Sequence, residues 1–276
     1  MTAAEHATAS TAIARSWLLA AAVGTDRLSA AAAAKPDCLI VDLEDGVPFA
    51  RKVEAREIAR EWLRSNRSWV RISDVTSEQH LLDVDAVRGA SGLLGVVLAK
   101  AESAQDVLRT ARLLPGLPIV PMIESARALT RAVEIADAEP AVRLAFGVGD
   151  FRHDTGIADT AVALTHARSQ LVVASRAAGL PGPIDGPSAG PDSVRADTRF
   201  AAELGMTGKL AVRPSDTAVV NDALTPSADD IAAATATIDR LGEHGERVVS
   251  GADMPRLAGA KTLLHRARQF GIPVGD

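Results

Sequence analysis

The segments Pro118-Ile-Val-Pro-Met-Ile-Glu124 and Arg143-Leu-Ala-Phe-Gly-Val-Gly-Asp-Phe151 each contain a short apolar run that ends in one carboxylate. Apolar runs of this length, bounded by turn residues, are typical of strands buried on both faces. Residues 125–138 between them have a helical composition, so the whole stretch predicts a βαβ unit. Parallel strands joined in this way usually lie side by side, roughly 4.8 Å apart. We therefore expect Glu124 and Asp150 to emerge together at the carboxyl edge of a sheet, where α/β folds bind ligands.

Two neighbouring carboxylates at such an edge repel each other unless a cation or a proton lies between them. Hard oxygen ligands favour Mg²⁺, which keeps some of its water or takes oxygens from a substrate. Gly147 and Gly149 leave room for a ligand to approach the backbone. Glu124 and Asp150 are therefore the candidate magnesium ligands. The alternative interpretation is structural, with Glu124 as a helix N-terminal carboxylate and Asp150 as a loop cap.

The composition describes an acidic, moderately apolar chain of 276 residues with 47% hydrophobic residues and a net charge of −5. Its basic residues are dispersed and only 3% of residues are aromatic, which argues against a nucleic-acid surface. The single cysteine, Cys38, rules out a disulfide framework and fits a cytoplasmic protein. No apolar run approaches membrane-spanning length, so we expect no membrane partner. Residues 1–14 are small and polar and lack the order of a signal peptide, which predicts a flexible leader.

A strand–helix alternation extends to about residue 224. Eight apolar segments are predicted to be strands, and polar residues cluster at their carboxyl ends. The seventh segment is only three residues long. This count favours a (β/α)8 TIM barrel over residues 15–226, a usual size for that fold. The predicted strands are residues 17–23, 38–43, 69–72, 94–98, 119–123, 144–149, 183–185 and 209–212.

The clearest strand signal, residues 38–43, carries charge deep within it. Alternation places Asp42 and Glu44 on one face of this strand. Charged side chains so close to an apolar core must be paired, hydrated or bound to a ligand.

The chain changes character after Pro226-Ser227. Two helices, predicted over residues 228–241 and 255–270, are joined by a polar loop that contains glycine, and Ser227 is a good N-cap candidate. We expect residues 227–276 to form a C-terminal helical arm or lid that folds over a neighbouring subunit or over the site.

A set of short motifs follows a consistent order along residues 15–270. They are Arg15-Ser-Trp-Leu18, Val41-Asp-Leu-Glu-Asp-Gly-Val-Pro48, Val70-Arg-Ile72, Val97-Leu-Ala-Lys-Ala-Glu-Ser103, Met122-Ile-Glu-Ser-Ala126, Gly147-Val-Gly-Asp150, Ser175-Arg-Ala-Ala-Gly-Leu-Pro181, Pro183-Ile-Asp-Gly186, Gly208-Lys209 and Arg213-Pro214. The ordered set resembles the CitE-like branch of the HpcH/HpaI aldolase superfamily, the citrate lyase beta-subunit family.

The resemblance implies roles for individual residues. In the family, the residues that match Glu124 and Asp150 hold Mg²⁺, the same pair that the strand ends indicate. The arginine matching Arg71 grips the carboxylate or oxo-acid part of the ligand, a task suited to a planar bidentate donor. The Glu-Asp pair matching Glu44 and Asp45 lies at the site and orients the metal's waters and nearby basic groups.

Further implied roles extend to other loops. Lys100 and Glu102 match residues that lie close to the site. The family's C-terminal arm carries an Asp-x-Pro motif, here Asp253-Met254-Pro255. In relatives, that aspartate reaches the active site of a neighbouring subunit and acts as an acid or base. The resemblance therefore implies a homo-oligomer, either a trimer or a hexamer.

Two motifs depart from the family pattern. The N-terminal loop usually has Pro-Gly or Pro-Ala, then an arginine and a lysine, but here residues 21–27 retain only Arg27. After the eighth strand, a common Ile-His-Pro is replaced by Val212-Arg213-Pro214. A cation in place of a neutral ring can alter which acyl group or phosphate is accommodated, so both departures leave the exact substrate open.

The implied reaction is Mg²⁺-dependent carbon–carbon cleavage of a carboxylated 3-hydroxyacyl-CoA to an acyl-CoA thioester and a small 2-oxo acid, or its condensing reverse. Two alternatives stay open: a class II aldolase that acts on free 2-oxo acids without CoA, and a non-catalytic ligand-binding or assembly subunit. The expected catalytic residues are Arg71, Glu44, Asp45 and Asp253, and the expected substrate-binding residues are Arg71, Arg27, Lys100, Glu124, Gly149 and Asp150.

Overall fold

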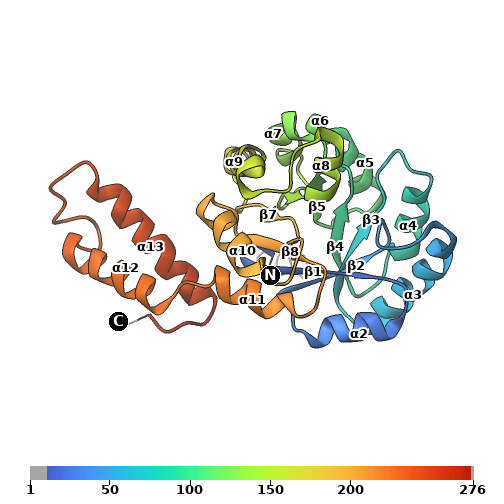
Figure 1. Cartoon of the computed structure of the whole chain (residues 1–276), viewed down its shortest axis with the longest axis horizontal. Helices are drawn as coiled ribbons and strands as arrows, with labels where there is room; N and C mark the ends of the chain where they lie inside the picture. The colour runs from blue at the N-terminus through green and yellow to red at the C-terminus, as the bar shows by residue number, and fades with distance from the viewer. Residues whose placement is uncertain (1–10, 275–276) are drawn as a thin grey trace. The chain divides into compact units, whose positions relative to one another are not determined.

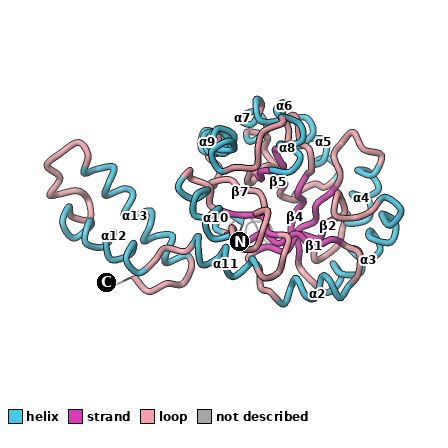
Figure 2. The backbone as a smooth tube through the Cα atoms, viewed as in Figure 1, coloured by secondary structure: helices cyan, strands magenta, loops and turns pink. Residues whose placement is uncertain are grey.

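The computed structural model describes residues 11–274, which contain a closed barrel of eight parallel strands in sequence order (Figure 1). Figure 2 shows the strands as an inner ring with helices around it. The structure confirms the predicted (β/α)8 TIM barrel. The strands are β1 Ser16–Ala21, β2 Cys38–Asp42, β3 Ser68–Ile72, β4 Leu93–Leu98, β5 Ile119–Ile123, β6 Ala145–Phe146, β7 Ile184–Asp185 and β8 Gly208–Ala211.

Helices connect the consecutive strands. The helix predicted over residues 125–138 is present as two short helices that break at Arg131, and the Ser125 hydroxyl caps the first by accepting the N–H of Ala128. The helices around the barrel are α2 Thr25–Ala33, the 3-10 helix η1 Phe49–Arg51, α3 Lys52–Ser65, α4 Gln79–Val87, α5 Ala104–Leu113, α6 Ala126–Thr130, α7 Ala132–Ala136, α8 Val148–Thr155, α9 Ala161–Ala177, α10 Val194–Glu203 and α11 Asp216–Leu224.

The barrel interior is apolar up to the carboxyl ends of the strands. Trp17 and Trp69 pack edge to face, with ring centroids 5.3 Å apart. Cys38, only 6% exposed, lies in the same cluster of buried side chains as Ile40 and Met122. These side chains fill the space within the strands, so the barrel is a packed core and its free surface for ligands lies at the ends.

Toward the carboxyl ends of the strands, the inward-facing positions become charged. Because strand residues alternate between the two faces, the next inward residues of β2, β3 and β5 are Asp42, Arg71 and Glu124. The register pairs Asp42 directly with Arg71. All three side chains are at least 92% buried. Parallel strands therefore deliver these charges to the same end of the barrel, as the sequence predicted for Glu124.

The strand predicted over residues 144–149 is shorter than expected. β6 ends at Phe146, and Gly147 still donates its N–H to Ile123 O at 3.0 Å. The next backbone bond, from Phe151 N to Gly147 O at 3.0 Å, already belongs to α8. Asp150 consequently lies in the first turn of a helix rather than directly at a strand end.

A buried ion cluster joins β7 to β8. Lys209 of β8 donates to Asp185 of β7 at 2.8 Å and to the carbonyl of Gly186 at 2.7 Å. Arg168 of α9 donates to the other oxygen of Asp185 at 2.8 Å. Since β7 contributes only two residues to the sheet and pairs with β8 at only two positions, these charge-assisted bonds reinforce that short ladder.

The amino-terminal segment was predicted as a leader over residues 1–14. Residues 1–10 of it lie outside the described part of the chain. The carbonyls of Thr11 and Ala14 accept hydrogen bonds from the fully buried Arg143, at 3.0 and 2.7 Å. The segment 11–14 is therefore part of the barrel's packed base.

A second compact unit begins at Leu224. Its two helices, α12 Ala228–Leu241 and α13 Asp253–Gln269, pack together through Ala234, Ala260 and Leu264. Ser227 and Asp230 form a capping box at the start of α12. Across residues 11–274, no helix combines the length and apolar character that a membrane span requires.

Candidate active site

Charged residues from five successive strand ends meet at the carboxyl end of the barrel. Seven side chains are linked to one another by hydrogen bonds, ion pairs or close electrostatic contact. They are Asp42, Glu44, Asp45, Arg71, Lys100, Glu124 and Asp150. All except Asp42 were predicted as site residues.

Arg71 is held by two acidic residues. Its Nε and Nη2 donate to the two oxygens of Asp42, both at 2.7 Å, and Nη1 lies 3.1 Å from Glu44 Oε2. Burial alone would raise the pKa of Asp42, but the guanidinium outweighs it and holds that pKa below its usual range. Arginine has five N–H donors, so these contacts leave donors on both terminal nitrogens for a ligand carboxylate.

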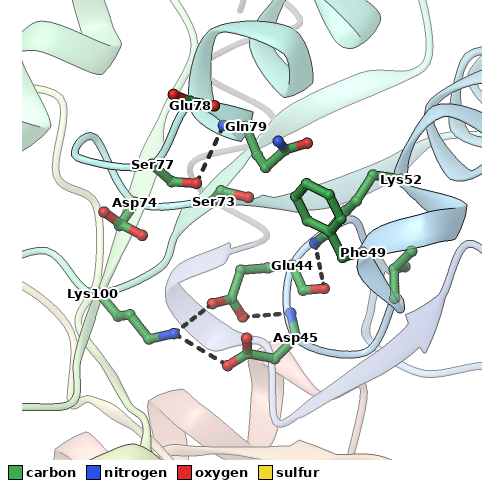
Figure 3. A pocket seen from close by; sticks show the side chains of 11 residues that line it. Glu44, Asp45, Phe49, Lys52, Ser73, Asp74, Ser77, Glu78, Gln79 and Lys100 are labelled. Carbon is green, nitrogen blue, oxygen red and sulfur yellow. Dashed lines mark hydrogen bonds and ion pairs between the residues drawn. The ribbon is translucent and has the colours of Figure 1, made fainter.

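Lys100 bridges the two residues that follow β2 (Figure 3). Its Nζ lies 2.9 Å from Glu44 Oε1 and 3.3 Å from Asp45 Oδ2, and the Asp45 N–H donates to Glu44 Oε2 at 2.7 Å. Burial opposes the charge on Lys100, but its hydrogen bond to Glu44 and the nearby carboxylates outweigh burial and raise the pKa of the ammonium. Lys100 therefore remains a fixed cation.

Glu124 is deeply buried, and unlike Asp42 it has no hydrogen bond to a cationic side chain. It is 3% exposed, and its Oε1 accepts the backbone N–H of Lys100 at 2.6 Å. Its Oε2 faces Gly147, where a Cβ would lie only 2.2 Å away. Burial raises the pKa of Glu124 well above its usual range, and Asp150, which shares a hydrogen bond with it, raises the pKa further.

The charges in this cluster do not balance. Five carboxylates face only two cations, Arg71 and Lys100, and both cations already contact other acids. The pair Glu124 and Asp150 is left without a cation of its own. In residues 11–274 no three or more His, Cys, Asp or Glu side chains are grouped to hold a metal ion. Two carboxylates with open coordination positions suit Mg²⁺, which typically binds through one or two carboxylates plus water or substrate oxygens.

Two cavities open beside Lys100. The first, of about 500 Å³, lies on the side of Glu44 and Asp45 (Figure 3) and is bordered by the highly exposed ring of Phe49. The second, of about 450 Å³, is lined by Glu102, Arg127 and other polar residues. Residues 73–79, directly after β3, contribute to both cavities, and sequence reasoning missed them although they follow a predicted strand. Ser73, Asp74, Ser77, Glu78 and Gln79 line the first cavity, and Asp74, Val75 and Thr76 line the second.

Other predicted residues lie outside the cluster. Arg27 is exposed in the first turn of α2, and in the described structure no hydrogen bond or ion pair joins it to the seven residues. Arg213 is paired with Asp216, Nη2 to Oδ2 at 2.9 Å. Gly149 is exposed, and a Cβ there would meet nothing within 4 Å, so the space above α8 is open.

Asp253 belongs to the second unit. It is the first residue of α13, is 3% exposed, and accepts the backbone N–H groups of Val249 and Ser250 at 3.3 and 3.0 Å. Arg256 lies 3.5 Å from its other oxygen. The Val249 N–H lowers the pKa of Asp253 most strongly, with further lowering from Ser250 and Arg240. The carboxylate is therefore locally fixed and ionised.

Comparison with known proteins identifies the lineage of this barrel. The family model of HpcH/HpaI aldolase/citrate lyase matches residues 15–214, and the HpcH/HpaI aldolase C-terminal domain matches residues 229–271. The chain belongs to the HpcH/HpaI aldolase/citrate lyase family. Membership of this family makes it a carbon–carbon lyase and confirms the resemblance inferred from the ordered motifs.

Family relatives match over most of their length. A citrate lyase subunit beta-like protein from Mycobacterium tuberculosis is 32% identical over 91% of this chain and 94% of its own. The mitochondrial citramalyl-CoA lyase of Mus musculus is 30% identical over 83% of this chain and 79% of its own. Among solved structures, CitE from Mycobacterium tuberculosis in complex with magnesium, acetoacetate and coenzyme A has a TM-score of 0.78 at 30% identity, covering 93% and 98% of the two chains.

Gly147 can be tested as the residue that makes room for Glu124. An alanine Cβ would lie 2.2 Å from Oε2 and 2.5 Å from the Cβ of Glu124, so either the acid or the backbone must move. We expect Gly147→Ala to lower the free energy of unfolding by about 1–3 kcal/mol, measured by urea denaturation.

The matched control for this variant is Gly149→Ala. Its Cβ would enter open space within α8, so we expect unchanged stability or a gain of up to about 1 kcal/mol from helix propensity. Equal effects of the two substitutions would contradict the role assigned to Gly147.

Proposed function

We propose that this chain is a Mg²⁺-dependent carbon–carbon lyase of the CitE type. It would cleave a carboxylated 3-hydroxyacyl-CoA to an acyl-CoA and a small 2-oxo acid, or form it from them. The observation that carries the proposal is the pair Glu124 and Asp150 at the carboxyl end of the barrel, where burial and the neighbouring Asp150 raise the pKa of Glu124. The relative solved with magnesium, acetoacetate and coenzyme A supports the same ligand classes.

Glu124 and Asp150 would hold the Mg²⁺ ion, which acts when bound as a Lewis acid toward the oxygens of an oxo acid. Arg71 would bind the acid's carboxylate through the N–H donors that Asp42 and Glu44 leave available. Because Arg71 is clamped by Asp42 in the strand register, its guanidinium is preorganised for a planar carboxylate. The cavities on both sides of Lys100 offer space for the remainder of the substrate.

Proton transfer is assigned to Asp253 of a neighbouring copy or to a water held near Glu44. The pKa of Asp253 is lowered by backbone N–H groups, so the residue is ionised near neutral pH, and it can act as a base only if its surroundings in the assembled site raise that pKa. This assignment requires a homo-oligomer, which we propose to be a trimer or hexamer located in the cytoplasm.

The function is tested by turnover. Acetyl-CoA or propionyl-CoA is incubated with glyoxylate, pyruvate or oxaloacetate and Mg²⁺, and the acyl-CoA products are followed by mass spectrometry. We expect a hydroxylated, carboxylated acyl-CoA from at least one combination. Asp150→Asn, or chelation of Mg²⁺, should reduce its formation by about 10²-fold or more.

The same assay separates the alternatives. Conversion of an oxo acid with a free aldehyde, without any thioester, would favour the class II aldolase. Mg²⁺-dependent binding of the acids without turnover of any combination would favour a non-catalytic subunit.

Mg²⁺ binding should tighten as pH rises. The folded state holds a proton on Glu124 above its ordinary pKa of 4.5, so metal-free stability falls as pH increases from that value through the raised pKa. Mg²⁺ must displace this proton, and its affinity should rise over the same window.

Calorimetric titrations in two buffers with different ionisation enthalpies will detect the released proton. Glu124→Gln should abolish both saturable binding and proton release. Tight binding with no proton release at any pH would argue against the raised pKa of Glu124.

Subunit complementation tests Asp253. Asp150→Asn and Asp253→Asn should each be inactive alone. Co-expression with random mixing should restore about a quarter of wild-type activity, because that fraction of sites combines an intact barrel with an intact arm from the other subunit. No recovery in oligomers whose mixed composition is verified by native mass spectrometry would rule out transfer between subunits.

A further inference from the structure

Lys100 adopts a backbone conformation that lysine normally avoids. Its φ is 47°, and Lys35, with φ 52°, is the other non-glycine residue with positive φ in the described part of the chain. A side chain with a Cβ pays a steric penalty in this left-handed region, and such residues often occur at functional sites. Lys100 follows β4 directly at the cluster of charges, whereas Lys35 lies between α2 and β2 at the other end of the barrel.

The left-handed conformation redirects one amide. The neighbouring N–H groups, on Ala99 and Ala101, donate to the adjoining barrel strands at Ile72 O and Met122 O, both at 3.2 Å. Between them, the N–H of Lys100 turns to Glu124 Oε1 at 2.6 Å. Because this short bond engages only one oxygen, it fixes which oxygen of Glu124 remains toward Gly147 and the start of α8.

The side chain of Lys100 has a separate task. Its ammonium contacts Glu44 and Asp45 and lines both cavities. A glycine would adopt the same backbone conformation at no steric cost, but it would supply no cation. The unfavourable backbone conformation of Lys100 therefore occurs at a residue whose ammonium contacts Glu44 and Asp45 in the loop after β2.

We propose that Lys100 is a positioning residue with two separable parts. Its backbone N–H orients Glu124 so that the second carboxylate oxygen, together with Asp150, is presented to a divalent cation. Its ammonium holds Glu44 and Asp45 at the edge of the cavity where the substrate is expected to bind. The inference rests on the proposed function for its metal.

Substitutions can separate the two parts. Lys100→Gly keeps the left-handed backbone and removes the ammonium, so we expect Mg²⁺ affinity within about threefold of wild type but turnover reduced by about tenfold or more. Lys100→Val removes the ammonium and disfavours the left-handed backbone, so Mg²⁺ affinity should also fall, by about 10–100-fold. Affinity is measured by calorimetry with Mg²⁺ alone.

Two further variants keep the test decisive. Lys100→Ala disfavours the conformation less than valine, so it should weaken Mg²⁺ binding by an intermediate factor even if the valine variant does not fold. Lys35→Gly and Lys35→Val are the matched controls: they should change thermal stability in opposite directions and leave Mg²⁺ affinity and turnover unchanged.

The outcomes test the role of Lys100 separately from the proposed function on which it rests. If the wild type binds Mg²⁺ and the folded valine and alanine variants bind it equally well, the backbone role is wrong and the proposed function stands. If Lys100→Gly turns over like wild type, the ammonium role is wrong. If the wild type shows no saturable Mg²⁺ binding, the proposed function fails and this inference fails with it.

Discussion

The ion pair of Asp42 with Arg71 is the contact on which the upper end of the barrel depends. It joins two adjacent strands in register, with both guanidinium bonds at 2.7 Å. The same Asp42 carboxylate accepts the N–H groups of Glu44 and Gly46 at 2.9 and 3.0 Å. One buried acid thus aligns the arginine and shapes the loop that carries Glu44 and Asp45. Removing it would leave a buried cation and an unanchored loop, a costly combination.

In the rest of the cluster, carboxylates outnumber cationic side chains. Each fixed cation already contacts acids of the protein, and the remaining pair of carboxylates at positions 124 and 150 can be relieved only by a proton or a cation. Burial and this shortage of positive charge together raise the pKa of Glu124, and the position of a Cβ at the nearby Gly149 is open. The proposed metal site at this pair therefore rests on the local geometry and on the residues that the family resemblance implies.

Much of this arrangement could be predicted from the sequence because strands carry strong signals. Continuous apolar runs located the strands, and the alternation of side chains placed Glu124 at the carboxyl end. Helix faces are harder to predict from hydrophobic spacing alone. The apolar Val53 of α3 is 72% exposed, whereas the charged Arg56 of the same helix is buried in an ion pair with Asp83. Such a burial depends on a partner 27 residues away, which no local pattern reveals.

Other features required coordinates for a similar reason. The left-handed backbone of Lys100 has no signature in residue type, and the helical start at Val148 follows from where the β6 ladder ends. The assignment of Arg71 to a ligand was made from the family pattern, which did not indicate that Asp42 occupies one edge of the guanidinium. Local composition predicts elements, whereas the sharing of donors and acceptors is decided by contacts between distant segments.

The single cysteine gives the barrel a chemical property that suits thioester ligands. Cys38 lies in the apolar interior, and burial raises the pKa of its thiol. A thiol that is neither accessible nor ionised does not attack thioesters or exchange with free thiols. Because the sequence has no other cysteine, the acyl-CoA of the proposed reaction would meet no accessible thiol of this chain that could be acylated or form a mixed disulfide.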